Sequence, residues 1–135
     1  MKFDTKLIGY ITLFEKYTGT EVKDCFFRES ELIFIVKEGQ LMRAIGKNGE
    51  NVKGLVAKIK HKIRVIGFDN DLTQFIKNLL YPINGFQIEK KDDGIYIIPN
   101  DTKTKGQIYG RERSNFKWVQ EVLNRHFNNI EIKVG

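Results

Sequence analysis

The apolar positions of the chain alternate between the spacing typical of helices and the spacing typical of strands. In residues 4–17 they recur every three or four positions, which predicts a helix that begins at Asp4 or Thr5 and stops at Gly19. The apolar run at 32–36 is unbroken, as in a central strand that is buried on both faces. The elements predicted for the first half are a helix at 4–17, strands at 21–28 and 32–36, helices at 40–45 and 50–60, and a strand at 63–66.

The same order of elements starts again after this strand. The predicted elements are a helix at 71–81, strands at 86–90 and 94–98, a weak helix at 103–109, a helix at 114–126 and a strand at 130–134. Residues of the two halves match at a shift of 64 positions, and the matching pairs are Gly46 and Gly110, Asn51 and Asn115, Val52 and Phe116, Leu55 and Val119, and Ile59 and Leu123. An internal repeat of about 65 residues therefore predicts two units, at 1–68 and 69–135.

The segment between the two copies, residues 66–70, is short and is not a long linker rich in Pro, Ser and Gly. We therefore expect two units that pack together. The alternative is a single α+β domain with a coincidental similarity between its halves, which the recurrence of six elements in the same order makes the weaker interpretation.

The tetrad Gly46-Lys47-Asn48-Gly49 lies between two predicted helices. Its two glycines leave backbone without Cβ atoms at the edges of the turn, so that a bulky anion can approach the main-chain N–H groups. The helix that follows points its free N–H groups and its positive dipole end to the same place, and Lys47 adds a cation. This arrangement suits a phosphate. A plain turn between helices with a solvated lysine is the alternative, because glycine is common in such turns.

The distribution of charge favours the phosphate interpretation. Residues 37–64 hold 8 basic and 2 acidic side chains, and the whole chain has a net charge of +6. Residues 103–135 hold 7 basic and 3 acidic side chains, whereas the stretches at 1–36 and 65–102 are net acidic. Two basic blocks separated by acidic ones indicate two places that meet a polyanion.

Composition excludes several other classes. With 41% hydrophobic residues the chain can build a core, but no apolar run approaches the roughly 20 residues that cross a bilayer. The N-terminus lacks the apolar segment of a signal peptide, and the single Cys25 fits a reducing compartment, so a cytoplasmic protein without a membrane partner is expected. Cys25 itself is expected in the core.

The remaining side chains show no catalytic constellation. A nucleotide-hydrolysing P-loop motif is missing, and one cysteine with two histidines cannot form a zinc site of standard spacing. The run Asp92-Asp93-Gly94 is better explained as a hairpin turn than as a metal site. We therefore expect no enzymatic activity, no metal and no cofactor.

A unit of helix, two strands, helix, GxxG loop, helix and strand resembles a KH domain of the prokaryotic topology. Two such units joined directly resemble the archaeal NusA-like transcription termination and antitermination proteins, most specifically at residues 42–66 with the run Ala44-Ile45-Gly46-Lys47-Asn48-Gly49-Glu50-Asn51-Val52. The fold that this resemblance implies is α+β, with a three-stranded sheet in each unit and helices on one face. Bacterial relatives also carry a polymerase-binding N-terminal domain and an OB-type domain, for which the two repeats leave no sequence.

The resemblance implies binding of single-stranded RNA, because the GxxG loop of KH domains holds about four nucleotides by their backbone, with the bases over an apolar groove. Carried over, Gly46 and Gly49 admit the phosphate, and Lys47 and Asn48 contact it. The other candidates of the first unit lie beside this loop or on the next strand, namely Arg43, Ile45, Asn51, Lys53 and Arg64.

Among these, Arg43 and Lys53 are expected to hold adjacent phosphates, and Arg64 to form a wall of the groove. Ile45, together with Val52, is expected to pack under bases, with plain core packing as an equal alternative.

The second unit departs from the family pattern, because its tetrad reads Gly110-Arg111-Glu112-Arg113. The missing fourth glycine is expected to hinder the left-handed backbone conformation, and Glu112 to repel phosphate. Arg111 and Arg113 can compensate as phosphate donors. We therefore expect an auxiliary RNA contact from Gly110, Arg111, Arg113 and Lys117, with a structural platform as the alternative. For Trp118, burial in the core is favoured over stacking on a base.

The function expected from these observations is RNA binding in transcription termination or antitermination, by a monomer that holds nascent single-stranded RNA. RNA polymerase or a transcription complex is a further candidate partner. A ribosome-associated or RNA-processing KH protein would use the same chemistry. A basic protein-interaction module that docks an acidic partner is the remaining alternative, and a small enzyme is disfavoured by the missing acid/base pair.

Overall fold

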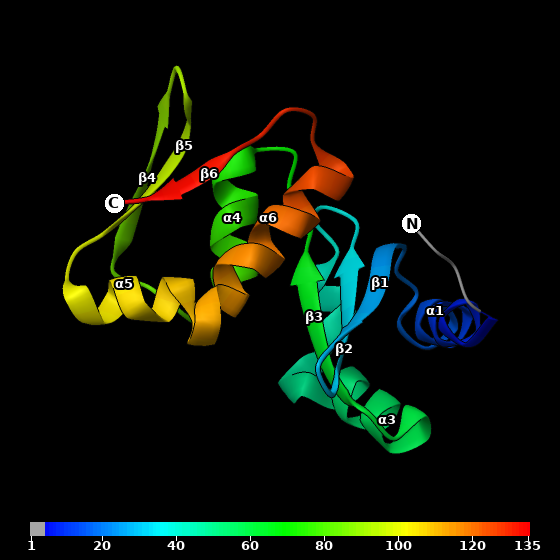
Figure 1. Cartoon of the computed structure of the whole chain (residues 1–135). Coiled ribbons are helices and arrows are strands. Elements are labelled where there is room, and N and C mark those ends of the chain that lie inside the picture. The colour runs from blue at the N-terminus through cyan, green and yellow to red at the C-terminus, as the bar shows by residue number, and fades with distance from the viewer. Residues whose placement is uncertain (1–4) are drawn as a thin grey trace. The chain divides into compact units, whose positions relative to one another are not determined.

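The computed structural model describes residues 5–135, so that the predicted N-cap at Asp4 lies outside the described residues (Figure 1). Its first seven elements are α1 (Thr5–Thr18), β1 (Val22–Arg28), β2 (Glu31–Val36), α2 (Leu41–Ile45), the 3₁₀ turn η1 (Lys47–Gly49), α3 (Glu50–Ile59) and β3 (Lys62–Gly67). The next seven are α4 (Leu72–Leu80), β4 (Phe86–Lys91), β5 (Gly94–Pro99), α5 (Thr102–Tyr109), the 3₁₀ turn η2 (Arg111–Arg113), α6 (Ser114–His126) and β6 (Ile132–Val134). Every predicted helix and strand is present in the predicted order, and the α+β class is confirmed.

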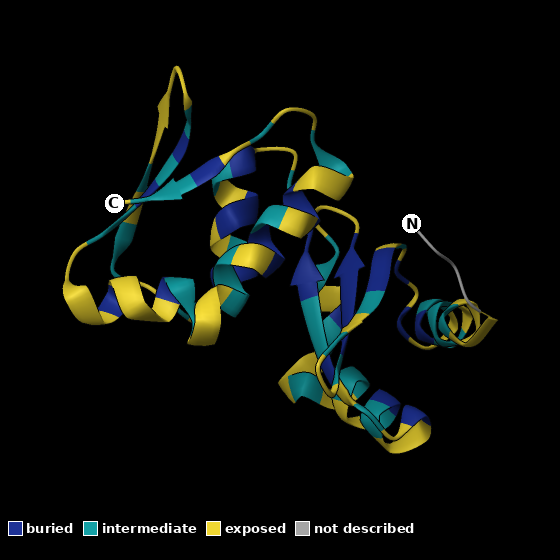
Figure 2. Ribbon diagram, viewed as in Figure 1, coloured by how far each residue is buried: buried dark blue, intermediate teal, exposed yellow. Residues whose placement is uncertain are grey.

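The first sheet has the strand order β1–β2–β3, with β1 antiparallel and β3 parallel to β2. β2 is the central strand of the sheet, and residues 32–36 are all buried, which shows that both of its faces are covered (Figure 2). The unbroken apolar run therefore belongs to a central strand that is buried on both faces, as predicted.

Three helices cover one face of this sheet. Phe14 of α1 stacks on Phe34 of β2, with ring centroids 4.2 Å apart. The buried cluster around this pair draws on all three helices and all three strands, namely Phe14, Cys25, Leu32, Phe34, Val36, Ala44, Leu55, Ile59 and Ile63. Cys25 is 2% exposed, which confirms its place in the core.

The end of α1 follows the predicted stop signal. Gly19 adopts a φ of 69°, and its backbone N–H donates to the carbonyl of Glu15 over 2.9 Å. A residue without Cβ takes this left-handed conformation without strain, so the helix ends here.

The second sheet repeats the topology of the first. Its strand order is β4–β5–β6, with β4 antiparallel and β6 parallel to β5. The buried residues of this unit alternate along β5 and recur on its helices, and they include Ile95, Ile97, Ile108, Val119, Leu123 and Ile132. Most of α5 is exposed, as Figure 2 shows, which agrees with the weak helical pattern of its sequence.

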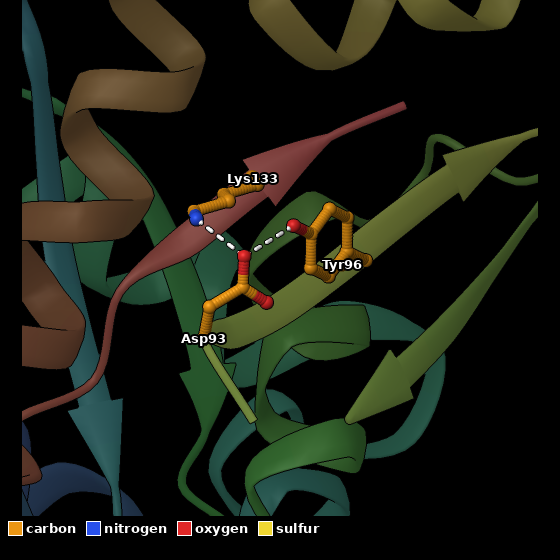
Figure 3. Close-up of polar contacts among 3 residues, drawn as sticks. All are labelled: Asp93, Tyr96 and Lys133. Carbon is orange, nitrogen blue, oxygen red and sulfur yellow. Dashed lines mark hydrogen bonds and ion pairs between the residues drawn. The ribbon is translucent and has the colours of Figure 1, made fainter. Parts of the chain in front are cut away.

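The hairpin between β4 and β5 turns at Asp92 and Asp93, so the hairpin predicted there is confirmed. An oxygen of the Asp93 carboxylate accepts hydrogen bonds from the Tyr96 hydroxyl, over 2.8 Å, and from the Lys133 ammonium, over 2.9 Å. Figure 3 shows these three side chains on the turn, on β5 and on β6. The carboxylate thus ties the turn of the hairpin to the strand on the other side of β5.

The contacts of the chain divide it into two compact units between Asn78 and Leu79, which is within α4. The first part of α4 is anchored to the end of the first unit. Phe75 lies with its ring centroid 4.9 Å from that of Phe68, and the Asn78 amide nitrogen donates to the Gly67 carbonyl over 2.8 Å. A boundary between domains at 68/69, which the repeat suggests, stays a prediction.

Candidate nucleic-acid interface

The GKNG loop closes one helix and opens the next. Gly46 has a φ of 80° and a ψ of 168°, and its N–H donates to the Met42 carbonyl of α2 over 3.0 Å. The N–H of Gly49 then donates to the Gly46 carbonyl over 3.1 Å. Gly49 lies in the left-handed region with a φ of 72°, and α3 starts immediately after it.

Gly46 is required for a second reason besides its backbone conformation. A Cβ atom at this position would lie 2.9 Å from the side-chain Cγ and Nδ2 atoms of Asn51 and 3.1 Å from its backbone nitrogen. The Asn51 Nδ2 atom donates to the Arg43 carbonyl over 3.0 Å. The candidate Asn51 is thus a brace that joins the start of α3 to α2, with one face against the glycine.

The cations around the loop are available to a ligand. Lys47, Arg43 and Lys53 are all exposed, and none of the three forms an ion pair with a residue in the range 5–135 that the structure describes. Asn48, which follows Lys47 in the turn, is also exposed and has a φ of 56°. Three positive charges without an acidic partner, beside a turn edged by two glycines, create a local potential that attracts polyanions.

The structure does not bring Arg64 to this site. Ile63 and Val65 of β3 pack into the cluster beneath the helices, so the alternation of the strand places Arg64 on the opposite face of the sheet. There its Nε atom lies 3.4 Å from a carboxylate oxygen of Glu31. Burial, followed by the nearby Arg64 charge, lowers the pKa of Arg28 on the same face.

The apolar candidates beside the loop differ in their packing. Val52 packs against the buried cluster of the first unit, which favours a role in the core, and Ile45 is half-buried at the end of α2. Met42 was not predicted, although its side chain is 78% exposed one turn before Gly46. The signal in the sequence that could have identified Met42 is an apolar residue at a position of α2 that does not face the core.

The second loop has the same backbone as the first. Gly110 has a φ of 71°, Glu112 of 54° and Arg113 of 63°, against 80°, 56° and 72° at the corresponding positions of the first loop. The N–H of Arg113 donates to the Gly110 carbonyl over 3.1 Å, as Gly49 does to Gly46. The expectation that the missing glycine hinders the left-handed conformation is therefore wrong, because Arg113 adopts it.

The brace is repeated as well. The Asn115 Nδ2 atom donates to the Gln107 carbonyl over 2.9 Å, and a Cβ atom on Gly110 would lie 2.9 Å from the Asn115 Cβ. The glycine and the asparagine that match between the two halves of the sequence therefore also make the same contact in each loop.

The side chains on the second loop differ from those on the first. Arg111, Glu112, Arg113 and Lys117 are exposed. Two half-buried rings stand where the first unit has aliphatic side chains: Tyr109 at the position of Ile45, and Phe116 at the position of Val52. Trp118 is 7% exposed, in agreement with the predicted core role.

Three comparisons with known proteins bear on this geometry. The family model described as KH domain matches residues 9–70, which include the whole GKNG loop. The probable transcription termination protein NusA of Methanococcus vannielii is 47% identical over 140 residues, covering 100% of this chain and 81% of the relative. The protein of the same name from Methanocaldococcus jannaschii is 32% identical, covering 99% of this chain and 75% of the relative. The chain belongs to this archaeal NusA-like family.

A solved structure has the same fold over nearly the whole chain. The crystal structure of APE1850 superposes with a TM-score of 0.72 at 26% identity, covering 98% of this chain and 100% of that one. The KH match ends at residue 70, so in this NusA-like chain the second unit is supported by its topology and by the full-length relatives. Within the described residues, the helices are too short or too polar to cross a membrane.

Proposed function

We propose that this NusA-like chain binds single-stranded RNA through the GKNG loop and holds a nascent transcript during transcription termination or antitermination. The observation that carries the proposal is the set of three exposed, unpaired cations around a loop whose backbone the Gly46–Asn51 contact fixes. A preformed loop loses little conformational entropy when it binds a flexible strand.

In the proposed complex, the RNA backbone passes the loop with a phosphate next to Lys47 and Asn48. Arg43 and Lys53, from the helices on either side, neutralise the neighbouring phosphates. Ile45 and the exposed Met42 offer apolar surface to the bases. Most of the affinity then comes from phosphate neutralisation and depends little on RNA sequence.

The relatives are named as transcription termination proteins, which supports termination over ribosome association or RNA processing. Contact with RNA polymerase, the monomeric state and the lack of enzymatic activity stay predictions.

The test is the double substitution Lys47→Asp with Asn48→Asp. Both side chains are exposed, and aspartate tolerates the φ of 56° found at Asn48, so the fold is expected to survive. Binding to a short fluorescent oligoribonucleotide, followed by anisotropy at moderate salt, is expected to be lost, while circular dichroism and the melting temperature stay unchanged.

A matched control places the same change of charge on the helix that follows the loop. Ala57→Glu with Lys58→Glu alters two exposed residues toward the end of α3 and is expected to weaken binding far less. Wild-type affinity in a folded Lys47/Asn48 variant would refute the first loop as the RNA site. If the wild-type protein itself has no affinity for oligoribonucleotides, the protein-interaction alternative is favoured.

A further inference from the structure

The second loop carries an aromatic pair that the first lacks. The rings of Tyr109 and Phe116 have their centroids 5.7 Å apart and are tilted by 43° to each other. Both residues are half-buried, so each keeps part of its surface accessible to solvent. Because the two loops have the same backbone, these rings occupy the positions of Ile45, which is half-buried, and of Val52, which packs against the core of the first unit.

A cation already lies over one of these rings. The guanidinium carbon of Arg113 is 5.1 Å from the centroid of the Tyr109 ring, which is within the range of a cation–π interaction. Arg113 is exposed and forms no ion pair with a residue of the described part of the chain, so its guanidinium can leave the ring for a phosphate. Planar bases stack on tyrosine and phenylalanine in the same way as a guanidinium does.

The charge of the second loop disfavours a copy of the first site. Glu112 stands where the first loop has Asn48, and a carboxylate at the tip of the turn repels phosphate. The neighbouring Arg111 and Arg113 offset this charge without creating the glycine-edged turn of the first loop. Binding energy at this loop must therefore come more from base contacts than at the GKNG loop.

We infer that the second loop is a base-stacking site, at which Tyr109 and Phe116 hold an unpaired base of single-stranded RNA and Arg113 moves to an adjacent phosphate. Purines are preferred over pyrimidines, because their larger π-face gains more from stacking. This inference rests on the proposed function, since its ligand is the RNA that the first loop is proposed to hold.

The test exchanges the rings for the residues of the first unit, in the variant Tyr109→Ile with Phe116→Val. These side chains keep the site apolar and are found on the same backbone in the first unit. The variant is expected to bind oligoadenylate about 5- to 100-fold more weakly than the wild type, and oligouridylate with a smaller loss. The slope of log affinity against log salt is expected to stay the same, because no charge is removed.

A variant that alters charge supplies the contrast. Arg111→Ala with Arg113→Ala keeps both rings and is expected to weaken binding several-fold while lowering the salt slope. If the ring variant binds oligoadenylate as tightly as the wild type, the stacking site is refuted.

The inference and the proposed function fail separately. Loss of binding in the Lys47/Asn48 variant together with full binding in the ring variant leaves the function standing and overturns the inference. If the ring variant does not fold, the unaltered protein decides: nuclear magnetic resonance signals of the Tyr109 and Phe116 rings are expected to shift when oligoadenylate is added. Rings whose signals do not move would overturn the inference.

Discussion

Asn51 and Asn115 make the same pair of contacts in the two loops. Each donates its side-chain amide nitrogen to a carbonyl eight residues earlier, and each lies against a glycine that has no room for a Cβ atom. The contact requires both partners, because a larger residue at the glycine would displace the amide, and a residue without the amide would release the preceding helix. At the scale of single residues, the shape of the loop depends on this pair.

The two glycines of the first loop are expected to differ in their tolerance of a side chain. Gly46→Ala combines backbone strain with a Cβ only 2.9 Å from Asn51, and is expected to lower the free energy of unfolding by about 2–3 kcal/mol. Gly49→Ala meets no atom within 4 Å and carries only the left-handed strain, about 1 kcal/mol. Urea denaturation of both variants measures the difference, and equal losses would contradict the role given to Asn51.

The sequence predicted Asn51 as a site residue but could not show its contact with Gly46 and Arg43, because that contact forms across the turn. The match of Gly46 and Asn51 with Gly110 and Asn115 was the available signal. The placement of Arg64 could have been anticipated from the strand pattern. Its neighbours Ile63 and Val65 point into the core, so Arg64 must point to the other face.

At the scale of elements, the Asp93 carboxylate adds a side-chain link between the turn of the β4–β5 hairpin and β6, beside the backbone pairing of β5 with β6. The hydrogen bond from Lys133, followed by that from Tyr96, holds the pKa of Asp93 below its ordinary value. The same contact with Asp93 raises the pKa of Lys133 and that of Tyr96. All three shifts favour a carboxylate, an ammonium and a neutral hydroxyl in the folded protein.

The sign of the pH dependence follows from these directions. The Asp93 contribution is full above the unfolded pKa of about 4 and is lost as the pH falls through the lower folded value. The Lys133 contribution is full below the unfolded pKa of about 10 and is lost as the pH rises through the higher folded value. The network is therefore complete around neutral pH.

The variant Asp93→Asn is expected to melt at a lower temperature than the wild type at pH 7, since it loses the charge-assisted bond from Lys133. The difference should shrink as the pH falls below about 4, because the wild-type carboxylate is then protonated as well. Asp92→Asn, at the other position of the turn, is the control and is expected to have little effect. A difference in melting temperature that does not change with pH would contradict this account.

The elements themselves were predictable from periodicity, since each buries one stripe or one face. The residue at which the first unit ends was harder to predict. Phe68 and Phe75 lie on opposite sides of the predicted boundary, and their ring contact, with the hydrogen bond from Asn78 to the Gly67 carbonyl, shows that the start of α4 is anchored to the preceding unit. A pattern of single residues does not report which of two neighbouring units a helix contacts.

At the scale of the whole molecule, the charge follows the loops. The basic stretches surround the tetrads at 46–49 and 110–113, while the acidic stretches form the remaining parts of each unit. This arrangement is expected to accelerate encounter with RNA through long-range attraction and to orient the loops toward it. Whether a loop binds mainly phosphates or mainly bases is then decided by its own side chains.

Salt titration measures this contribution. If the first loop engages about four phosphates, the slope of log affinity against log salt for single-stranded RNA is expected to be about −3. The Lys47→Asp variant should give a shallower slope, because one phosphate contact is lost. An affinity that does not depend on salt would contradict binding through the phosphate backbone.

The resemblance in the sequence carried the family assignment, which the relatives then showed over the full chain. What the sequence could not provide was the conformation of the second loop. The loss of the fourth glycine suggested a different turn, yet Arg113 takes the left-handed conformation, and the two different tetrads share one backbone in the structure.

The exposed Asn48–Gly49 peptide also has a consequence for handling the protein. Asparagine followed by glycine deamidates readily, because the unhindered glycine nitrogen can attack the side-chain carbonyl carbon and release ammonia through a succinimide. In the native loop this nitrogen donates to the Gly46 carbonyl, which slows the attack. A carboxylate acquired at position 48 during storage would reproduce one of the two substitutions in the Lys47/Asn48 variant, so aged preparations are expected to bind RNA more weakly while they remain folded.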